Sequence, residues 1–208
     1  MSVSLNKLMG KLQPAIDWSG PSQPIPPAAA MPSDLAALLQ VHNGVSVFAG
    51  GLRVFGATTS LLHSIAEWNQ ELLWRFEYKG LCHGLTFFAE DVFGNQFGFT
   101  GAGEIFRFHA ETGDREAGGR NFCDWLDRTL AEPEEELSLW LLNDWNRSGI
   151  PVQLSQHLCP KVPFLAHGPY ECSNLYTCDR VESMRFKGGV ADQIRNFPTG
   201  TTIEIKVR

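Results

Sequence analysis

The segment at 85–114 constrains the fold of this chain more than any other part of the sequence. It holds three short runs rich in aromatic residues, separated by Gly94-Asn95 and by the glycine turn at 101–103. The runs cover residues 85–90, 96–100 and 104–110. Strand-like runs between residues that tolerate positive φ predict an antiparallel meander, with the rings of each run on one face. The segment carries no catalytic spacing, so it favours a binding surface on a sheet over an enzyme pocket.

Composition indicates a globular chain that stays in the cytoplasm. Of its 208 residues, 43% are hydrophobic and 19% are charged, which is ordinary for a soluble domain. No run of about 18 apolar residues exists to span a membrane. The first 18 residues contain no continuous apolar segment and no small-residue cleavage site, which argues against a secretory signal. We therefore expect a cytoplasmic protein.

The cysteines and histidines form no recognisable metal or catalytic motif. Five cysteines are an odd number in a chain too large to need disulfides, so reduced, mostly buried thiols are expected. They are Cys82, Cys123, Cys159, Cys172 and Cys178. The sequence contains no CxxC, HxxxH, HExxH or GxSxG spacing. We expect no metal, no cofactor and no catalytic residue.

Negative charge is concentrated in the window 111–136. The chain has a net charge of −6, and the nine acidic residues and three arginines of this window account for all of it. Such a patch repels phosphate backbones and anionic lipid heads, and it attracts basic proteins. We therefore expect a basic protein partner, with no direct binding of nucleic acid or of a membrane. A solvated helix face is the alternative interpretation of the same charges.

Periodicity and turn residues predict an α+β chain. Helices are expected at 5–12, from a Ser33 cap to Asn43-Gly44, at 61–76, from an Asn121 cap to Pro133, at 134–147 and at 190–197. Besides the meander, strands are expected on both sides of Gly50-Gly51 and at 202–208. A proline-rich stretch at 19–32 is typical of an extended connector.

Four short motifs in the first two-thirds of the chain resemble the SUKH superfamily, which includes a yeast cell-wall-synthesis regulator and many bacterial immunity proteins. They stand in the family's order and cover about residues 31–131. The motifs are Met31–Leu35 with His42–Gly44 around the first core helix, Ile65–Asn69, Phe88–Asn95, and Glu111–Asp114. The aromatic Phe93 departs from the family pattern, as do the connector and the tail beyond Pro151.

The resemblance implies a bent antiparallel sheet with helices packed mainly on one side. With the chain beyond the family's common core included, we expect an N-terminal helix and connector at 1–31, a core at 32–147 and a C-terminal α+β appendage at 148–208 packed on the core. It also implies a non-catalytic immunity protein that binds and blocks a cognate toxin domain, such as a nuclease or deaminase, in the bacterial cytoplasm. Complementary charge between an acidic surface and a basic toxin would suffice for such inhibition.

The expected partner-binding residues are polar residues of the meander turns together with one tryptophan. Glu90 and Asp91 are expected to be solvated at the end of a strand, beside Asn95. Trp140 is the leading aromatic candidate because the other tryptophans are easier to place inside. The full set is Glu90, Asp91, Asn95, Glu111, Asp114, Glu116 and Trp140.

Two other functions are compatible with the sequence. A regulatory or scaffold module would bind a protein partner that is not a toxin, and a toxin gene immediately upstream would distinguish immunity from this role. A hydrolase would use Asp91 with His83 or His109 and would require a deep pocket that joins these side chains. The oligomeric state and the chemistry of a toxin are not encoded in any pattern of the sequence.

Overall fold

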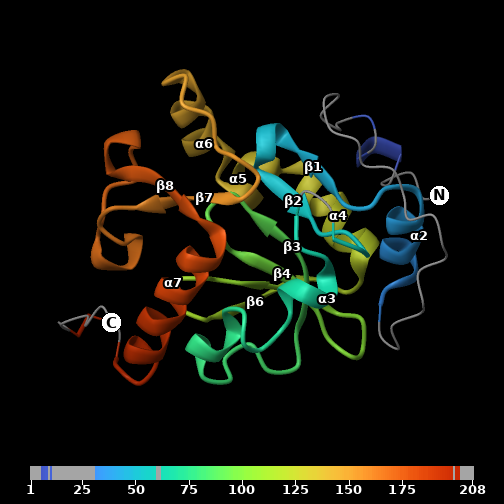
Figure 1. The fold of residues 1–208 in the computed structure, drawn as a ribbon, viewed down its shortest axis with the longest axis horizontal. Helices are drawn as coiled ribbons and strands as arrows, with labels where there is room; N and C mark the ends of the chain where they lie inside the picture. The colour runs from blue at the N-terminus through green and yellow to red at the C-terminus, as the bar shows by residue number, and fades with distance from the viewer. Residues whose placement is uncertain (1–5, 9, 11–30, 60–61, 199, 202–208) are drawn as a thin grey trace.

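A six-stranded antiparallel sheet forms the centre of the molecule (Figure 1). The structure, a computed structural model, describes residues 6–8, 10, 31–59, 62–198 and 200–201. The α+β fold is confirmed. The helix expected at 5–12, the connector at 19–32 and the strand at 202–208 lie wholly or largely outside the described residues. No helix within the described part of the chain is long and apolar enough to cross a membrane.

The strands follow one another across the sheet in sequence order. They are β1 (Val45–Val47), β2 (Leu52–Val54), β3 (Thr86–Asp91), β4 (Gln96–Phe99), β5 (Ile105–Phe108) and β6 (Arg115–Gly119). The predicted meander is therefore confirmed as β3, β4 and β5, and the two strands predicted around Gly50-Gly51 are β1 and β2. Strand β6 was not expected, because its glycines and charges do not alternate with apolar residues.

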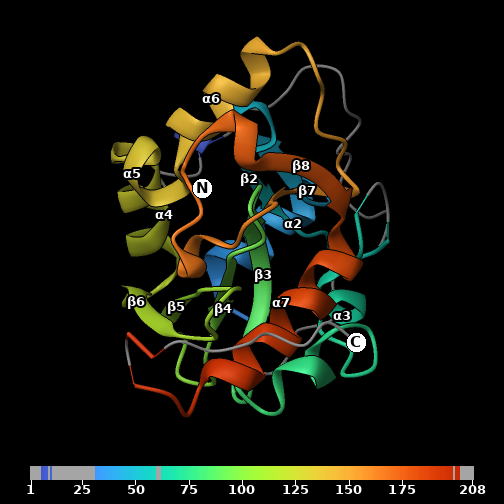
Figure 2. The ribbon, with the colours of Figure 1, turned by 90° about the vertical axis from the view of Figure 1, so that its left-hand side faces the viewer.

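Aromatic side chains fill both faces of this sheet. Phe87 and Phe88 are neighbours on β3 and point in opposite directions, as successive strand residues do. The Phe87 ring lies 5.6 Å from Trp74 on one side, and the Phe88 ring lies 4.9 Å from Trp125 on the other. We refer to these as the Trp74 face and the Trp125 face. Figure 2 shows α3 and α7 on one side of β3 and α4 and α5 on the other, so the helices cover both faces rather than mainly one.

The helices differ from the sequence-based boundaries in several places. They are α2 (Ser33–Val41), α3 (Ile65–Trp68), α4 (Phe122–Ala131), α5 (Pro133–Leu137), α6 (Leu139–Arg147) and α7 (Arg180–Ile194), with 3-10 turns η1 (Phe48–Gly50), η2 (Arg75–Tyr78), η3 (Phe164–Ala166) and η4 (Cys172–Asn174). The predicted cap Asn121 accepts a hydrogen bond from the Asp124 amide and begins α4. Ser33, by contrast, makes no side-chain cap and is the first residue of α2.

The long helix predicted at 61–76 is wrong, because the described part of it stops at Trp68. Asn69 ends it by turning its amide to the sheet, where it donates to the Phe87 carbonyl (2.7 Å) and accepts from the Phe87 amide (2.8 Å). The single helix predicted at 134–147 is also wrong. Ser138 takes a left-handed conformation (φ 51°) and separates α5 from α6.

The C-terminal segment packs directly on the sheet. Strands β7 (Gln156–Pro160) and β8 (Leu175–Asp179) form a separate two-stranded sheet that leads into α7. Helix α7 is longer than the predicted segment at 190–197 and packs against η2. Gly188 permits this contact, because a Cβ there would lie 2.8 Å from the Cβ of Glu77 and from the Tyr78 ring.

Candidate functional site

Glu90 lies at the centre of a buried charge network and not on the surface. Its side chain is fully buried on the Trp74 face, beside Arg53, His157 and Arg180, which are themselves 0–2% exposed. Its carboxylate oxygens lie 3.7 Å from Arg53, 3.2 Å from His157 and 3.3 Å from Arg180. The expectation that Glu90 is solvated and contacts a partner is wrong, because the C-terminal segment covers it.

This network joins strands β2 and β3 to the C-terminal segment. Arg53 on β2 donates hydrogen bonds to the carbonyls of Gln156 (2.6 Å) and Leu154 (3.2 Å). Arg180, the first residue of α7, lies with its guanidinium 3.8 Å from the centre of the Trp68 ring. Glu90 therefore fixes where β7 and α7 dock.

Burial changes the protonation of the network. Burial alone would raise the pKa of Glu90, but Arg180, His157 and Arg53 outweigh it and hold this pKa at about 2. Burial lowers the pKa of His157 to about 4, in spite of the opposing effect of Glu90. At neutral pH the carboxylate is therefore ionised and the imidazole is neutral.

Asp91 is also fully buried, so its expected exposure is wrong as well. It points away from Glu90, as successive residues of a strand do, and one oxygen accepts from the amides of Phe93 and Asn95 (both 2.9 Å). Its other oxygen accepts from the Asn95 side chain (2.8 Å) and lies 3.4 Å from Arg107. Asp91 thus holds the β3–β4 turn in shape, and burial raises its pKa.

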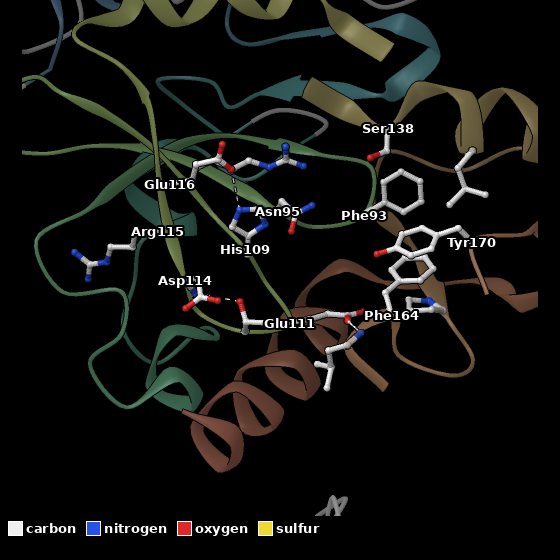
Figure 3. Close-up of a pocket in the computed structure, with 15 residues that line it drawn as sticks. Phe93, Asn95, His109, Glu111, Asp114, Arg115, Glu116, Ser138, Phe164 and Tyr170 are labelled. Atoms are coloured by element: carbon white, nitrogen blue, oxygen red, sulfur yellow. Dashed lines mark hydrogen bonds and ion pairs between the residues drawn. The ribbon is translucent and has the colours of Figure 1, made fainter. Parts of the chain in front are cut away.

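An open cavity of about 540 Å³ lies beside this turn (Figure 3). Strands β5 and β6 and the turn between them form one side, and the 160–170 segment with Ser138 and Leu141 forms the other. Four of the seven expected partner-binding residues line it, namely Asn95, Glu111, Asp114 and Glu116. The structure thus brings these four residues together at one cavity, whereas Glu90 and Asp91 are buried.

The acidic side of the cavity comes from the β5–β6 hairpin. Glu116 lies 3.1 Å from His109, and both side chains are partly exposed. One Glu111 oxygen accepts from the Leu165 amide (3.1 Å), which ties the hairpin to the opposite side of the cavity. Asp114 is exposed. Three carboxylates therefore face the same volume.

The two arginines of the cavity already have partners. Arg107 lies against Asp91. Arg115 points out of the cavity in Figure 3 and donates to the carbonyls of Leu81 (3.1 Å) and His83 (2.8 Å). Neither of these guanidinium groups forms an ion pair with a carboxylate of the hairpin. Glu116 lies 4.0 Å from Arg128, but both side chains are about half exposed, so water screens this pair. The exposed carboxylates give the cavity an acidic side that favours a cation.

The aromatic side of the cavity comes from the C-terminal segment. The rings of Phe164 and Tyr170 stack in parallel, with centroids 4.1 Å apart and planes 3° apart. Trp140 on α6 lies 6.4 Å from Tyr170 and is 46% exposed, which agrees with its expected exposure. Tyr170 is 56% exposed, so this stack presents ring surface to solvent.

Sequence reasoning missed Phe164 and Tyr170. Both lie in the proline-marked stretch that the sequence analysis treated only as part of the appendage. A weak indication of them was present in the sequence, since each aromatic residue directly follows a proline, Pro163 or Pro169, in a segment without strand or helix periodicity. Only the fold brings them opposite a hairpin about 50 residues earlier in the chain.

The geometry does not assemble the Asp–His pair that a hydrolase would use. The Asp91 carboxylate is buried and occupied by the β3–β4 turn and Arg107, whereas His109 lies against Glu116 and His83 is exposed. Among the residues that the structure describes, no group of three or more His, Cys, Asp or Glu side chains could hold a metal ion.

No family model and no curated protein matches this sequence. Among solved structures, the fold is similar to that of Atu4351 from Agrobacterium tumefaciens, with a TM-score of 0.51 and 12% sequence identity. The similarity covers 82% of this chain and 84% of that one. At this identity the similarity bears on the fold alone.

Proposed function

We propose that this chain is a non-catalytic binding protein of the immunity type, which takes a basic segment of a toxin domain into the cavity between the β5–β6 hairpin and the 160–170 segment. One observation carries the proposal: three carboxylates face a stacked aromatic pair across an open cavity whose arginines are already engaged. Membership of the SUKH superfamily, the bacterial cytoplasm as location and the toxin as partner are parts of this proposal.

A basic side chain fits this arrangement for two separate reasons. The carboxylates of Glu111, Asp114 and Glu116 supply charge-assisted hydrogen bonds to a guanidinium or ammonium group. The exposed faces of Tyr170 and Trp140 supply ring surface on which a cation or its alkyl stem packs. Binding of this kind blocks a toxin by covering its surface, and it requires no chemistry from the chain that binds.

The test uses a fluorescent oligo-arginine peptide as probe and an oligo-glutamate peptide of equal length as its control. We expect the purified chain to bind the first peptide and not the second, with affinity that falls as salt rises. The double variant Asp114→Asn/Glu116→Gln should bind up to about fivefold more weakly per removed charge. The control variant Glu132→Gln/Glu135→Gln removes two exposed charges at α5, outside the cavity, and should bind as the parent does.

The result decides between functions. Equal binding by the cavity variant and the parent would reject the cavity as the basic-peptide site. If the cavity variant alone loses binding, the toxin domain encoded beside this gene is the next ligand to measure. Cavity binding without any such neighbouring gene would favour the regulatory or scaffold function over immunity.

A further inference from the structure

Two cysteines of the β7–β8 hairpin form a pair that the proposed binding function does not use. Cys159 lies opposite Tyr176 and Cys178 lies opposite His157, so the two cysteines are diagonal neighbours on one face of the two-stranded sheet. Their side chains are in hydrogen-bond contact with each other. The Cys159 sulfur also lies 3.3 Å from the Ser183 hydroxyl on α7.

The surroundings of this pair favour one thiolate. The hydrogen bond from Cys178 lowers the pKa of Cys159 to about 6; burial and Glu111 oppose this shift, whereas Lys187 and Ser183 reinforce it. The same hydrogen bond, together with burial, raises the pKa of Cys178. The pair therefore shares one proton near neutral pH, and a thiolate is the nucleophilic form of cysteine.

A second cavity gives small molecules access to the pair. It has a volume of about 270 Å³ and is lined by both cysteines, by Tyr176 on β8 and by Phe186 and Lys187 on α7. Cys159 is 4% exposed, whereas Cys178 is partly exposed and stands nearer the solvent. A molecule of the size of hydrogen peroxide can therefore reach sulfur without opening the fold.

The other thiols with shifted pKa values lack this environment. Burial raises the pKa of Cys82 to about 12, and burial together with Asp144 raises that of Cys172. Neither has a second cysteine as its hydrogen-bond partner. The reactive character is a property of the β7–β8 pair and not of cysteines in this chain generally.

We propose that Cys159 and Cys178 are a redox-active dithiol that hydrogen peroxide converts into an intramolecular disulfide. The Cys159 sulfur attacks one peroxide oxygen, the O–O bond breaks, and Cys159 becomes a sulfenic acid as one water is released. Cys178 then attacks this sulfur, the S–O bond breaks, and the second water leaves. Two thiols lose two electrons and two protons in total, and one peroxide is reduced to two waters.

The placement of the pair favours a reversible bond over a permanent one. Diagonal residues on neighbouring strands have Cα atoms roughly 7–8 Å apart, which is slightly more than the 4.4–6.8 Å typical of disulfides. The dithiol fits the hairpin as it stands, whereas the disulfide requires β7 and β8 to shift. A bond of that kind is readily reduced by small thiols.

The test starts from the reduced full-length chain and a small excess of hydrogen peroxide, followed by intact-mass measurement and peptide mapping. We expect a product two hydrogens lighter than the parent, with a Cys159–Cys178 cross-link that millimolar reduced glutathione reverses. The alkylation rate at neutral pH should be roughly tenfold higher at Cys159 than at Cys172. These measurements use the unaltered chain, so they do not depend on how a variant folds.

Three variants complete the test. Cys178→Ser should stop at the sulfenic acid, which dimedone traps at Cys159, and Cys159→Ser should form no intramolecular cross-link with peroxide. Cys172→Ser should behave as the parent does. A cross-link to Cys123 or Cys172 instead, added oxygen without any cross-link, or equal rates at Cys159 and Cys172 would each overturn the proposal. None of these results depends on whether the chain binds a basic peptide.

Discussion

The buried network around Glu90 and the open cavity around Glu116 contain the same kinds of side chain but have different roles, one in docking the C-terminal segment and the other in the proposed binding. Each combines a carboxylate with a histidine and at least one arginine at 3–4 Å. Glu90 is fully buried, whereas Glu116 is half exposed beside a cavity of about 540 Å³. Residue type alone therefore does not separate a docking element from a binding site, but burial does.

The different roles of Glu90 and Glu116 can be tested most directly by neutralising each glutamate in turn. Glu90→Gln leaves Arg53 and Arg180 buried without a counter-charge, so we expect a loss of about 3–5 kcal/mol in the free energy of unfolding. Urea denaturation followed by tryptophan fluorescence measures it. Because Glu90 docks the C-terminal segment, protease sensitivity should rise first within 150–195. A loss below about 1 kcal/mol would show that the network does not hold that segment.

Acid should weaken the buried network by an amount set largely by His157. The folded chain keeps this imidazole neutral down to about pH 4, whereas the unfolded chain protonates it near pH 6.5. Between these values the unfolded state binds more protons, so stability falls as pH falls, by roughly 3 kcal/mol in total. The depressed pKa of Glu90 extends the loss below about pH 4.5.

Urea denaturation at a series of pH values from 4 to 7.5 measures this dependence. His157→Asn should remove most of it and leave the smaller contribution of His63, whose pKa burial also lowers. The same pH dependence in parent and variant would mean that His157 is not the group responsible.

The smallest effect is expected at the cavity. Glu116→Gln removes ion pairs with His109 and Arg128 that water largely screens, so the free energy of unfolding should change by less than about 0.5 kcal/mol. The same urea titration, with Glu90→Gln as reference, measures the contrast. A loss above about 1.5 kcal/mol would place Glu116 with Glu90 as a structural residue and would weaken the case for a free acidic cavity.

Local features of the fold were predictable because they depend on neighbours in the sequence. Alternating aromatic residues between glycine turns predicted β3, β4 and β5, and the polar Asn121 predicted the start of α4. The helix predicted at 61–76 failed for a non-local reason. The Asn69 side chain forms hydrogen bonds with both the amide and the carbonyl of Phe87, 18 residues away. Helical periodicity in the sequence does not predict such a contact.

Half of the cavity was predictable in the same sense. The carboxylates of the β5–β6 hairpin lie close together in the sequence, so the concentration of negative charge at 111–136 predicted an acidic surface there. Phe164 and Tyr170 complete the opposite wall from a segment 50 residues away, and the register of β7 and β8 sets the Cys159–Cys178 pairing. The carboxylates and the rings of the cavity meet only when the C-terminal segment docks.

The sequence by itself determined the α+β class, the meander and the position of the acidic hairpin, because alternation, turn chemistry and charge act over a few residues. Only the tertiary structure decided that Glu90 and Asp91 are buried while Glu111, Asp114 and Glu116 line a cavity. The physical reason is that exposure depends on what covers a side chain. For Glu90 the cover is β7 and α7, some 65 to 90 residues further along the chain.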